Sequence, residues 1–198
     1  MIKFKGFCKD IKDLPVSELP KNAVQFQEAE SNRELTLHSL LFSIPVIVFI
    51  ACVVLLKRHM SGIAVPFDND NIIGVLLSFL FVLPHELLHA ICFPKTEDIS
   101  IYFTSFGACC YSSAIISKRR FITMSLFPAL ILGIIPLLVW LLFSTSGKGW
   151  EILYAFSAMN LLCCCGDFYN VYNAIRQMPS GTYQQLSGPH SYWFYLEQ

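Results

Sequence analysis

The residues with the clearest chemical potential form a short motif, His-Glu-x-x-His, at positions 85 to 89. On an α-helix, residues four apart share one face, with Cβ atoms roughly 5–6 Å apart. His85 and His89 are therefore predicted to reach one Zn²⁺ together, at the usual Zn–N distance of about 2.0–2.1 Å. Glu86 is rotated about 100° around the helix from His85. It is better placed to take a proton from a metal-held water than to bind the metal, which makes it a candidate general base.

Two histidines alone do not hold a catalytic zinc, so a third ligand is expected from another helix. Asp167 is the only other acidic residue well inside an apolar stretch of the chain. If helices over 72–93 and 150–174 run in the same direction, His85, His89 and Asp167 lie about 20, 26 and 26 Å along them. This agreement in depth favours Asp167 as the third ligand. The alternative is an acidic residue at a helix end near the membrane surface.

Asn160 precedes Asp167 by seven residues, two turns along one helical face. It could orient a substrate carbonyl or hydrogen-bond Asp167, and a hydrogen bond between helices explains it equally well. The eight cysteines do not indicate a disulfide framework. Three of them, at 163–165, would point in three directions around one helix, and buried cysteine packs as a small apolar residue. Packing is therefore the favoured interpretation of the cysteines.

The elements that must position these residues are apolar. Of the 198 residues, 55% are hydrophobic and 14% charged, with a mean hydropathy of +0.54. Soluble domains carry roughly 25% charged residues. Four long stretches nearly free of charge predict transmembrane helices near 37–56, 72–93, 122–143 and 150–174. Buried helices of a soluble protein are the alternative. A formal net charge of zero argues against nucleic-acid binding.

With four spans, both termini and the loop 94–120 share one side of the membrane, and that side carries eleven of the 14 Lys and Arg residues. The excess of positive charge predicts that this side is cytoplasmic, and that the metal site lies near it. The chain is accordingly divided into a cytoplasmic arm over 1–34, a four-helix metallopeptidase-like domain over 35–176 and a cytoplasmic tail over 177–198.

The loop between the second and third helices carries a strand-like pattern. Residues 99–104 alternate apolar with small or polar side chains, 105–107 could turn the chain, and 108–116 could return it. This pattern predicts a β-hairpin. The predicted fold is an all-α membrane protein of four transmembrane helices, with this small hairpin between helices two and three.

Three features of the chain resemble the membrane zincin peptidases, a bacterial family of small four-helix proteins. They are the motif at 85–89, the pair Gly166-Asp167, and the basic run 117–121 that leads to Pro128. The similarity covers most of residues 15–175. The chain is more distantly similar to site-2 proteases, which are intramembrane metalloenzymes. It departs from their pattern at Phe168, which follows Asp167 where glycine is expected.

The resemblance implies His85, His89 and Asp167 as zinc ligands and Glu86 as the catalytic base. We therefore expect a zinc metalloendopeptidase in a bacterial cytoplasmic membrane, with one Zn²⁺ per chain. Its substrates would be membrane proteins or their juxtamembrane stretches. The alternative is a non-catalytic membrane protein that keeps a structural metal and acts as a regulator or binding partner. A transporter ranks last, because the acidic residues within the spans lie near one membrane face only.

Overall fold

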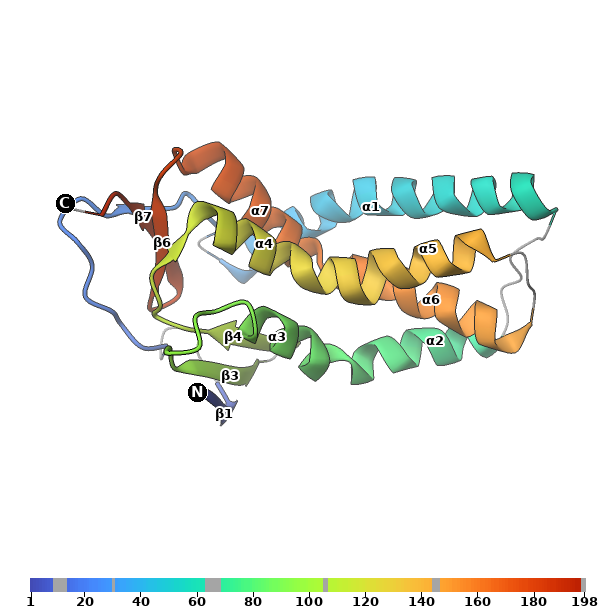
Figure 1. The fold of residues 1–198 in the computed structure, drawn as a ribbon, viewed down its shortest axis with the longest axis horizontal. Coiled ribbons are helices and arrows are strands. Elements are labelled where there is room, and N and C mark those ends of the chain that lie inside the picture. The colour runs from blue at the N-terminus through green and yellow to red at the C-terminus, as the bar shows by residue number, and fades with distance from the viewer. Residues whose placement is uncertain (9–13, 30, 63–68, 105–106, 144–146, 197–198) are drawn as a thin grey trace. The chain divides into compact units, whose positions relative to one another are not determined.

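The computed structural model describes residues 1–8, 14–29, 31–62, 69–104, 107–143 and 147–196. The chain forms two compact units (Figure 1). The first unit combines Met1–Glu30, Val82–Phe127 and Asn170–Gln198, and the second combines Ser31–Phe81 and Pro128–Tyr169. The two ends of the chain, expected to be an arm and a tail, thus belong to a unit that also contains the middle of the chain.

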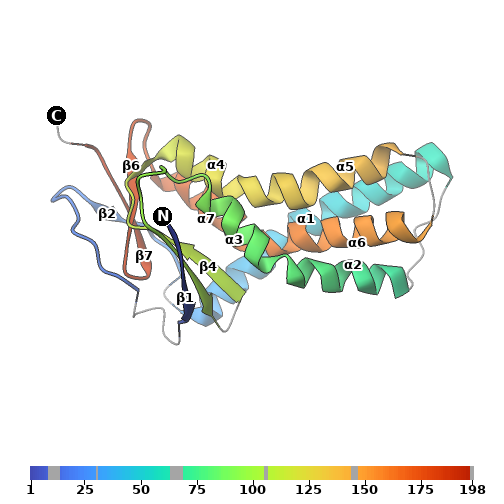
Figure 2. The ribbon, with the colours of Figure 1, turned by 60° about the horizontal axis from the view of Figure 1, so that its bottom comes forward.

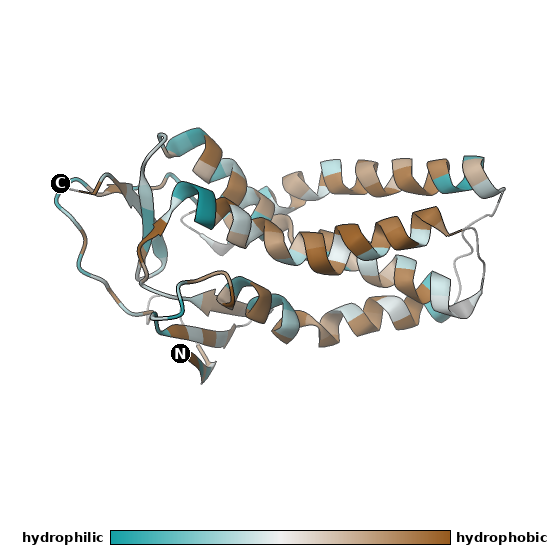
Figure 3. Cartoon of the chain, viewed as in Figure 1, coloured by the Kyte–Doolittle hydropathy of each residue, from teal (hydrophilic) through white to brown (hydrophobic). Residues whose placement is uncertain are grey.

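The second unit is built from helices, and apolar residues dominate them (Figure 3). They are α1 (Asn32–Ser61), α2 (Asn69–Leu80), the π-helix η2 (Ala129–Ile134), α5 (Ile135–Leu142), α6 (Lys148–Cys163) and the first part of α7 (Cys165–Gln177). The core of this unit comes from α1, α5, α6 and their neighbours, and includes Val46, Ile50, Leu137, Trp140 and Leu161.

Helices α2 and α6 run side by side in both ribbon views (Figures 1 and 2). The close approach depends on Gly74, since a Cβ atom there would lie only 2.4 Å from the Ile152 carbonyl oxygen. One turn later, the Ser78 hydroxyl lies 3.1 Å from the carbonyl oxygens of both Gly74 and Phe156. Small residues four apart let apolar helices pack backbone against backbone, as they do here.

Lys57 ties the end of α1 to the end of α5. Its side chain is 1% exposed, and its Nζ donates to the carbonyl oxygens of Trp140 at 2.8 Å, Leu141 at 3.3 Å and Phe143. The last carbonyls of a helix lack intrahelical donors and carry partial negative charge, so a cation stabilises them. The ammonium also lies 5.3 Å from the centre of the Trp140 ring.

The first unit contains two small sheets, the helices α3 (Val82–Ala90) and α4 (Lys118–Pro128), and the last part of α7. One sheet has the order β1-β3-β4 and the other β2-β7-β6-β5. The strands are β1 (Ile2–Phe7), β2 (Val24–Gln25), β3 (Ile99–Thr104), β4 (Gly107–Tyr111), β5 (Ile116–Ser117), β6 (Tyr183–Ser187) and β7 (His190–Phe194). Its core includes Phe26, Phe93, Ile116, Phe121 and Met178.

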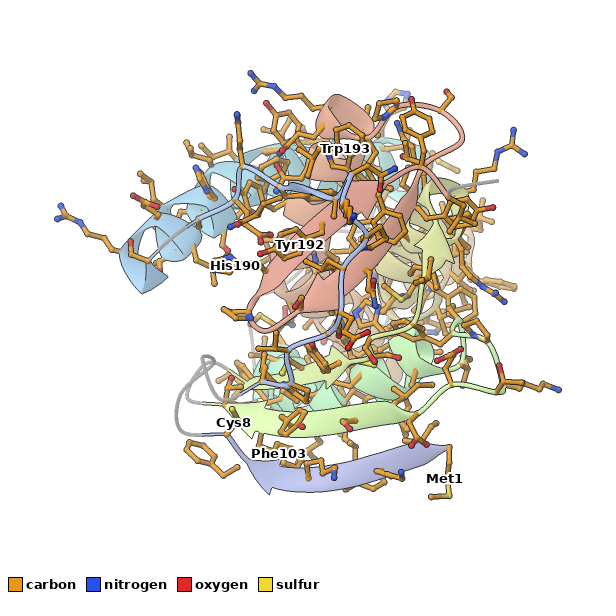
Figure 4. All side chains as sticks on the ribbon, turned by 90° about the vertical axis from the view of Figure 1, so that its left-hand side faces the viewer. Met1, Cys8, Phe103, His190, Tyr192 and Trp193 are labelled. Carbon is orange, nitrogen blue, oxygen red and sulfur yellow. The ribbon has the colours of Figure 1, made fainter. Side chains whose placement is uncertain are left out.

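Strand β1 pairs in parallel with β3, so the two ends of β1 meet different parts of the hairpin (Figure 4). The Met1 amine donates to the Glu97 carbonyl at 2.6 Å, and Lys3 bonds the Asp98 carboxylate at 2.6 Å. At the far end, the Cys8 amide donates to the Phe103 carbonyl at 2.8 Å. The N-terminal segment is thereby fixed to the hairpin at both ends.

The predicted hairpin is confirmed, because β3 and β4 pair antiparallel with Thr104 opposite Gly107. Its predicted turn residues 105 and 106 lie outside the described residues. The fold is mostly helical, as predicted, but it contains more strand than the expected hairpin alone. Strands β1, β2, β6 and β7 were not predicted. Strand β5 lies at the end of the predicted return strand 108–116, but it belongs to the second sheet and does not continue the hairpin.

Two helical stretches, Arg33–Ser61 and Lys118–Leu142, are each long and apolar enough to cross a membrane. Two further stretches meet this condition only if each bent helix pair forms one span. These pairs are Asn69–Leu80 with Val82–Ala90, and Gly149–Cys163 with Cys165–Gln177. The described residues therefore contain two to four candidate spans, located where the four apolar stretches were predicted.

The break between α2 and α3 has a local cause in Pro84. Proline has no N–H for the carbonyl four residues earlier, here that of Leu80, and its ring clashes with that carbonyl. Helix α2 ends at Leu80, and α3 begins at Val82, which places Pro84 in its first turn. Helices tolerate proline there, because the first amides have no intrahelical acceptor. Proline thus starts a new helix just before the histidines.

Candidate metal centre

Helix α3 brings the two motif histidines together as predicted. The Nε2 atoms of His85 and His89 face each other at 3.1 Å, with ring centres 4.9 Å apart and ring planes at 76°. Two nitrogens bound to one tetrahedral zinc would lie about 3.3 Å apart. The separation of the two Nε2 atoms is thus close to that of two nitrogens bound to one zinc ion.

The other ring nitrogen of His89 is held by the backbone. Its Nδ1 lies 2.9 Å from the carbonyl oxygen of Met124 in α4. A carbonyl only accepts hydrogen bonds, so Nδ1 carries the proton and Nε2 presents its lone pair toward His85. Metal-ligating histidines usually have such a partner, which fixes the tautomer and the ring orientation. His89 is therefore prepared to bind a metal through Nε2.

Glu86 lies next to the histidines and is 7% exposed. Its charge is felt by two thiols of β4, the strand that packs against α3. Burial, and after it the charge of the Glu86 carboxylate, raise the pKa of Cys109 to about 11. Burial and then Glu86 also raise the pKa of Cys110. Both thiols are thus neutral at physiological pH. The buried Glu86 carboxylate beside two histidines is an arrangement typical of a catalytic site.

Asp167 and Asn160 belong to the second unit. Asp167 lies in the first turn of α7, and the Sγ of Cys164 is within 4.8 Å of one of its carboxylate oxygens. The Asn160 side chain is 2% exposed and donates to the Phe156 carbonyl of its own helix at 2.8 Å. That bond lies within α6 and joins no two helices, so both interpretations of Asn160 stay open. The role of Asp167 as third ligand stays a prediction.

Two features of this region escaped the sequence analysis. Cys164 is a further side chain beside Asp167 that could bind a metal, and its spacing of three residues from Asp167 would have indicated it. The Met124 carbonyl could have been found through Pro128, which lies four residues later and has no N–H to offer it. Both signals are spacings within a helix.

Comparison with known proteins identifies a family that matches part of the chain. Residues 78–183 match a protein family described as "Putative zincin peptidase". The match begins near the end of α2 and ends at the start of β6, so it includes the motif on α3, the hairpin, and Asp167. Searches of curated proteins and of solved structures found no match.

Proposed function

The chain belongs to this zincin peptidase family, and on that premise we propose that it is a membrane-embedded zinc metalloendopeptidase. The observation that carries the proposal is the pair of Nε2 atoms of His85 and His89, 3.1 Å apart, with the buried Glu86 beside them. The substrates we propose are membrane proteins or their juxtamembrane stretches. The helices apolar enough to cross a membrane support this choice.

The proposed ligands are His85, His89 and Asp167, which make a two-histidine, one-carboxylate set that leaves a position for water. Bound zinc would lower the pKa of that water and polarise the substrate carbonyl. Glu86 would accept the water's proton as general base and then donate it to the departing amine. Asn160 remains a candidate for orienting Asp167 or the substrate.

A peptide bond must be presented in extended form, and β4 offers a place for it. In the order β1-β3-β4, strand β4 is at one edge of its sheet, and it packs against the helix that carries Glu86. Edge strands bind extended peptides by main-chain hydrogen bonds. We propose that a substrate segment pairs with β4. Its peptide bond would then lie near the candidate base.

The proposed location is a bacterial cytoplasmic membrane, with both termini and the metal centre on the cytoplasmic side. The distribution of Lys and Arg along the sequence supports this orientation. Cysteine accessibility at each chain end, measured in sealed vesicles with a membrane-impermeant reagent, would test it. Labelling of the two ends from opposite sides would contradict it.

The decisive experiment is Glu86→Gln in the full chain purified in detergent, assayed for zinc content and for cleavage of fluorescein-labelled casein. We expect zinc to stay at about one per chain and cleavage to fall at least about 100-fold, since the base is lost and the ligands remain. Glu18→Gln, at an exposed glutamate, is the matched control. Full activity of Glu86→Gln would refute the mechanism.

Asp167→Ala tests the third ligand. Retention of one zinc per chain in this variant would exclude Asp167 as a ligand.

The second candidate function is a structural metal site in a non-catalytic regulator or binding partner, and Cys164 favours it. A thiolate beside Asp167 could fill the position that a catalytic zinc leaves open for water. Substitution with Co²⁺ distinguishes the two, because thiolate ligation gives a strong near-ultraviolet charge-transfer band. A band that is lost in Cys164→Ser would favour the structural site. Absence of that band, together with cleavage that depends on Glu86, would favour the peptidase.

A further inference from the structure

The Met124 carbonyl that holds His89 is unusual within its helix. In an α-helix, the carbonyl of residue 124 accepts the amide hydrogen of residue 128. Residue 128 is proline and has no such hydrogen, and it is the last residue of α4, followed by the π-helical turn η2. The Nδ1 of His89 lies 2.9 Å from this same oxygen. The carbonyl without its usual helical donor is thus the one that contacts the histidine.

We propose that Pro128 is a positioning residue for the metal centre: by withholding the helical hydrogen from Met124, it leaves that carbonyl oriented toward His89. The consequence is the His89 tautomer with hydrogen on Nδ1 and a lone pair on Nε2. This inference rests on the proposed zinc site, since the tautomer matters only if Nε2 binds a metal. Pro128 acts through two other residues and touches neither metal nor substrate in this scheme.

The surroundings make the anchor rigid. Phe121 and Ser125, on the same helix as Met124, are 5% and 1% exposed, and Phe121 belongs to the core of the first unit. The Pro128 ring is also fully buried. His89 itself is 8% exposed, so its ring has little freedom. A carbonyl fixed in a packed helix holds a ligand better than a mobile side chain would, because no rotamer entropy is lost on binding.

The test is Pro128→Ala in the full chain, with Pro136→Ala as the matched control. Pro136 lies further along the same helical stretch, in the first turn of α5, where its missing hydrogen bond concerns no histidine. Zinc affinity is measured by competition with a chromophoric chelator. Loss of an outer-shell partner typically lowers metal affinity 10–100-fold. We expect about a tenfold loss for Pro128→Ala and less than about a twofold change for Pro136→Ala.

A second readout does not depend on metal or activity. In metal-free protein labelled with ¹⁵N-histidine, nitrogen chemical shifts at about pH 8 report the tautomer of each neutral ring. His89 signals are assigned by their absence in His89→Gln. We expect wild-type His89 to carry its hydrogen on Nδ1, and Pro128→Ala to populate the other tautomer as well.

The outcomes separate this inference from the proposed function. If wild-type His89 carries its hydrogen on Nε2, the inference is wrong even if Pro128→Ala cannot be purified. Unchanged affinity and tautomer in Pro128→Ala would also overturn it. A wild type that binds no zinc, yet shows the expected tautomer and its loss in Pro128→Ala, would remove the proposed function and keep the hydrogen-bond relation.

Discussion

The two units of the molecule use buried polar side chains in different ways. In the second unit, Lys57 and Ser78 donate to backbone carbonyls of neighbouring helices, and Asn160 donates to a carbonyl of its own helix. In the first unit, His89 contacts a carbonyl through one nitrogen only, and its other nitrogen faces His85. The first arrangement satisfies the side chain within the fold. The second leaves a pair of ligand atoms directed at one point.

This difference in hydrogen-bond partners distinguishes buried polar side chains with a structural role from those with a chemical role. Polar groups are costly to bury, so every one of them attracts attention as a functional candidate. The partner decides between the two roles. A donor directed at a carbonyl of a neighbouring helix contributes to packing, as Ser78 does. The two imidazole nitrogens that lie 3.1 Å apart face each other, and this arrangement points to a metal site.

The largest expected effect comes from His85→Ala. Removing one ligand should lower zinc affinity by more than about 100-fold, since the loss of an outer-shell partner alone costs 10–100-fold. The melting temperature of the metal-free protein should stay within a few degrees of wild type, because His85 is not part of either core. Metal analysis and thermal unfolding in detergent measure both quantities. His59→Ala, at an exposed histidine of α1, is the control. An equal loss of zinc in this variant would contradict the different roles given to the two units.

Lys57→Met should show the opposite pattern, with stability lost and zinc affinity kept. A buried carbonyl left without its donor costs about 1–3 kcal/mol, and loss of the buried charge offsets part of this cost. We expect the free energy of unfolding to fall by about 2 kcal/mol in thermal or denaturant unfolding. Arg58→Met, at the exposed neighbour, should change it by less than about 0.5 kcal/mol. If Lys57→Met instead released the metal at unchanged stability, the assignment of roles to the two units would be wrong.

Gly74→Ala tests the close packing of α2 and α6. The added Cβ would lie 2.4 Å from the Ile152 carbonyl oxygen and 2.8 Å from the Ala155 Cβ, so the helices must separate. Such overpacking costs about 1–3 kcal/mol. Gly149→Ala is the control, since nothing lies within 4 Å of its Cβ position, and it should gain up to about 1 kcal/mol from helix propensity. Equal effects of both substitutions on thermal unfolding would show that the packing is less tight than described.

The smallest effect concerns pH and the anchoring of β1. The hydrogen bond from Lys3 lowers the pKa of Asp98, and the charges of Lys3 and the Met1 amine lower it further. A carboxyl whose pKa falls on folding stabilises the fold above its unfolded value, and this contribution is lost as the pH falls through the folded value. The protection factors of the β1 amides, which correct for the pH dependence of intrinsic exchange, should therefore fall under acid conditions. Asp98→Asn should exchange faster at neutral pH and lose this pH dependence, whereas unaltered exchange would exclude the anchor.

Much of the fold could be predicted from the sequence, because apolar runs and strand alternation depend on local pattern. The helices over the four apolar stretches and the hairpin at 99–111 follow from such patterns. Strands β1 and β7 could not, since β1 pairs with residues 99–103 and β7 with Val24 and β6. Long-range pairing leaves no periodic signal in a single short segment. Likewise, the histidine spacing predicted the facing nitrogens, but the Met124 carbonyl comes from another helix.

The strand pairings also determine the order in which parts of the chain can fold during synthesis. The amide of Ser191 donates to the carboxylate of Glu28, 163 residues earlier, and Phe26 bonds the Ser191 carbonyl. The sheet β2-β7-β6-β5 can therefore close only after β7 has left the ribosome. Helices such as α1 and α2 need only local contacts and form first. The unit that carries the histidine motif is thus completed last, and a nascent chain would hold α3 in an unfinished setting until β7 has been made.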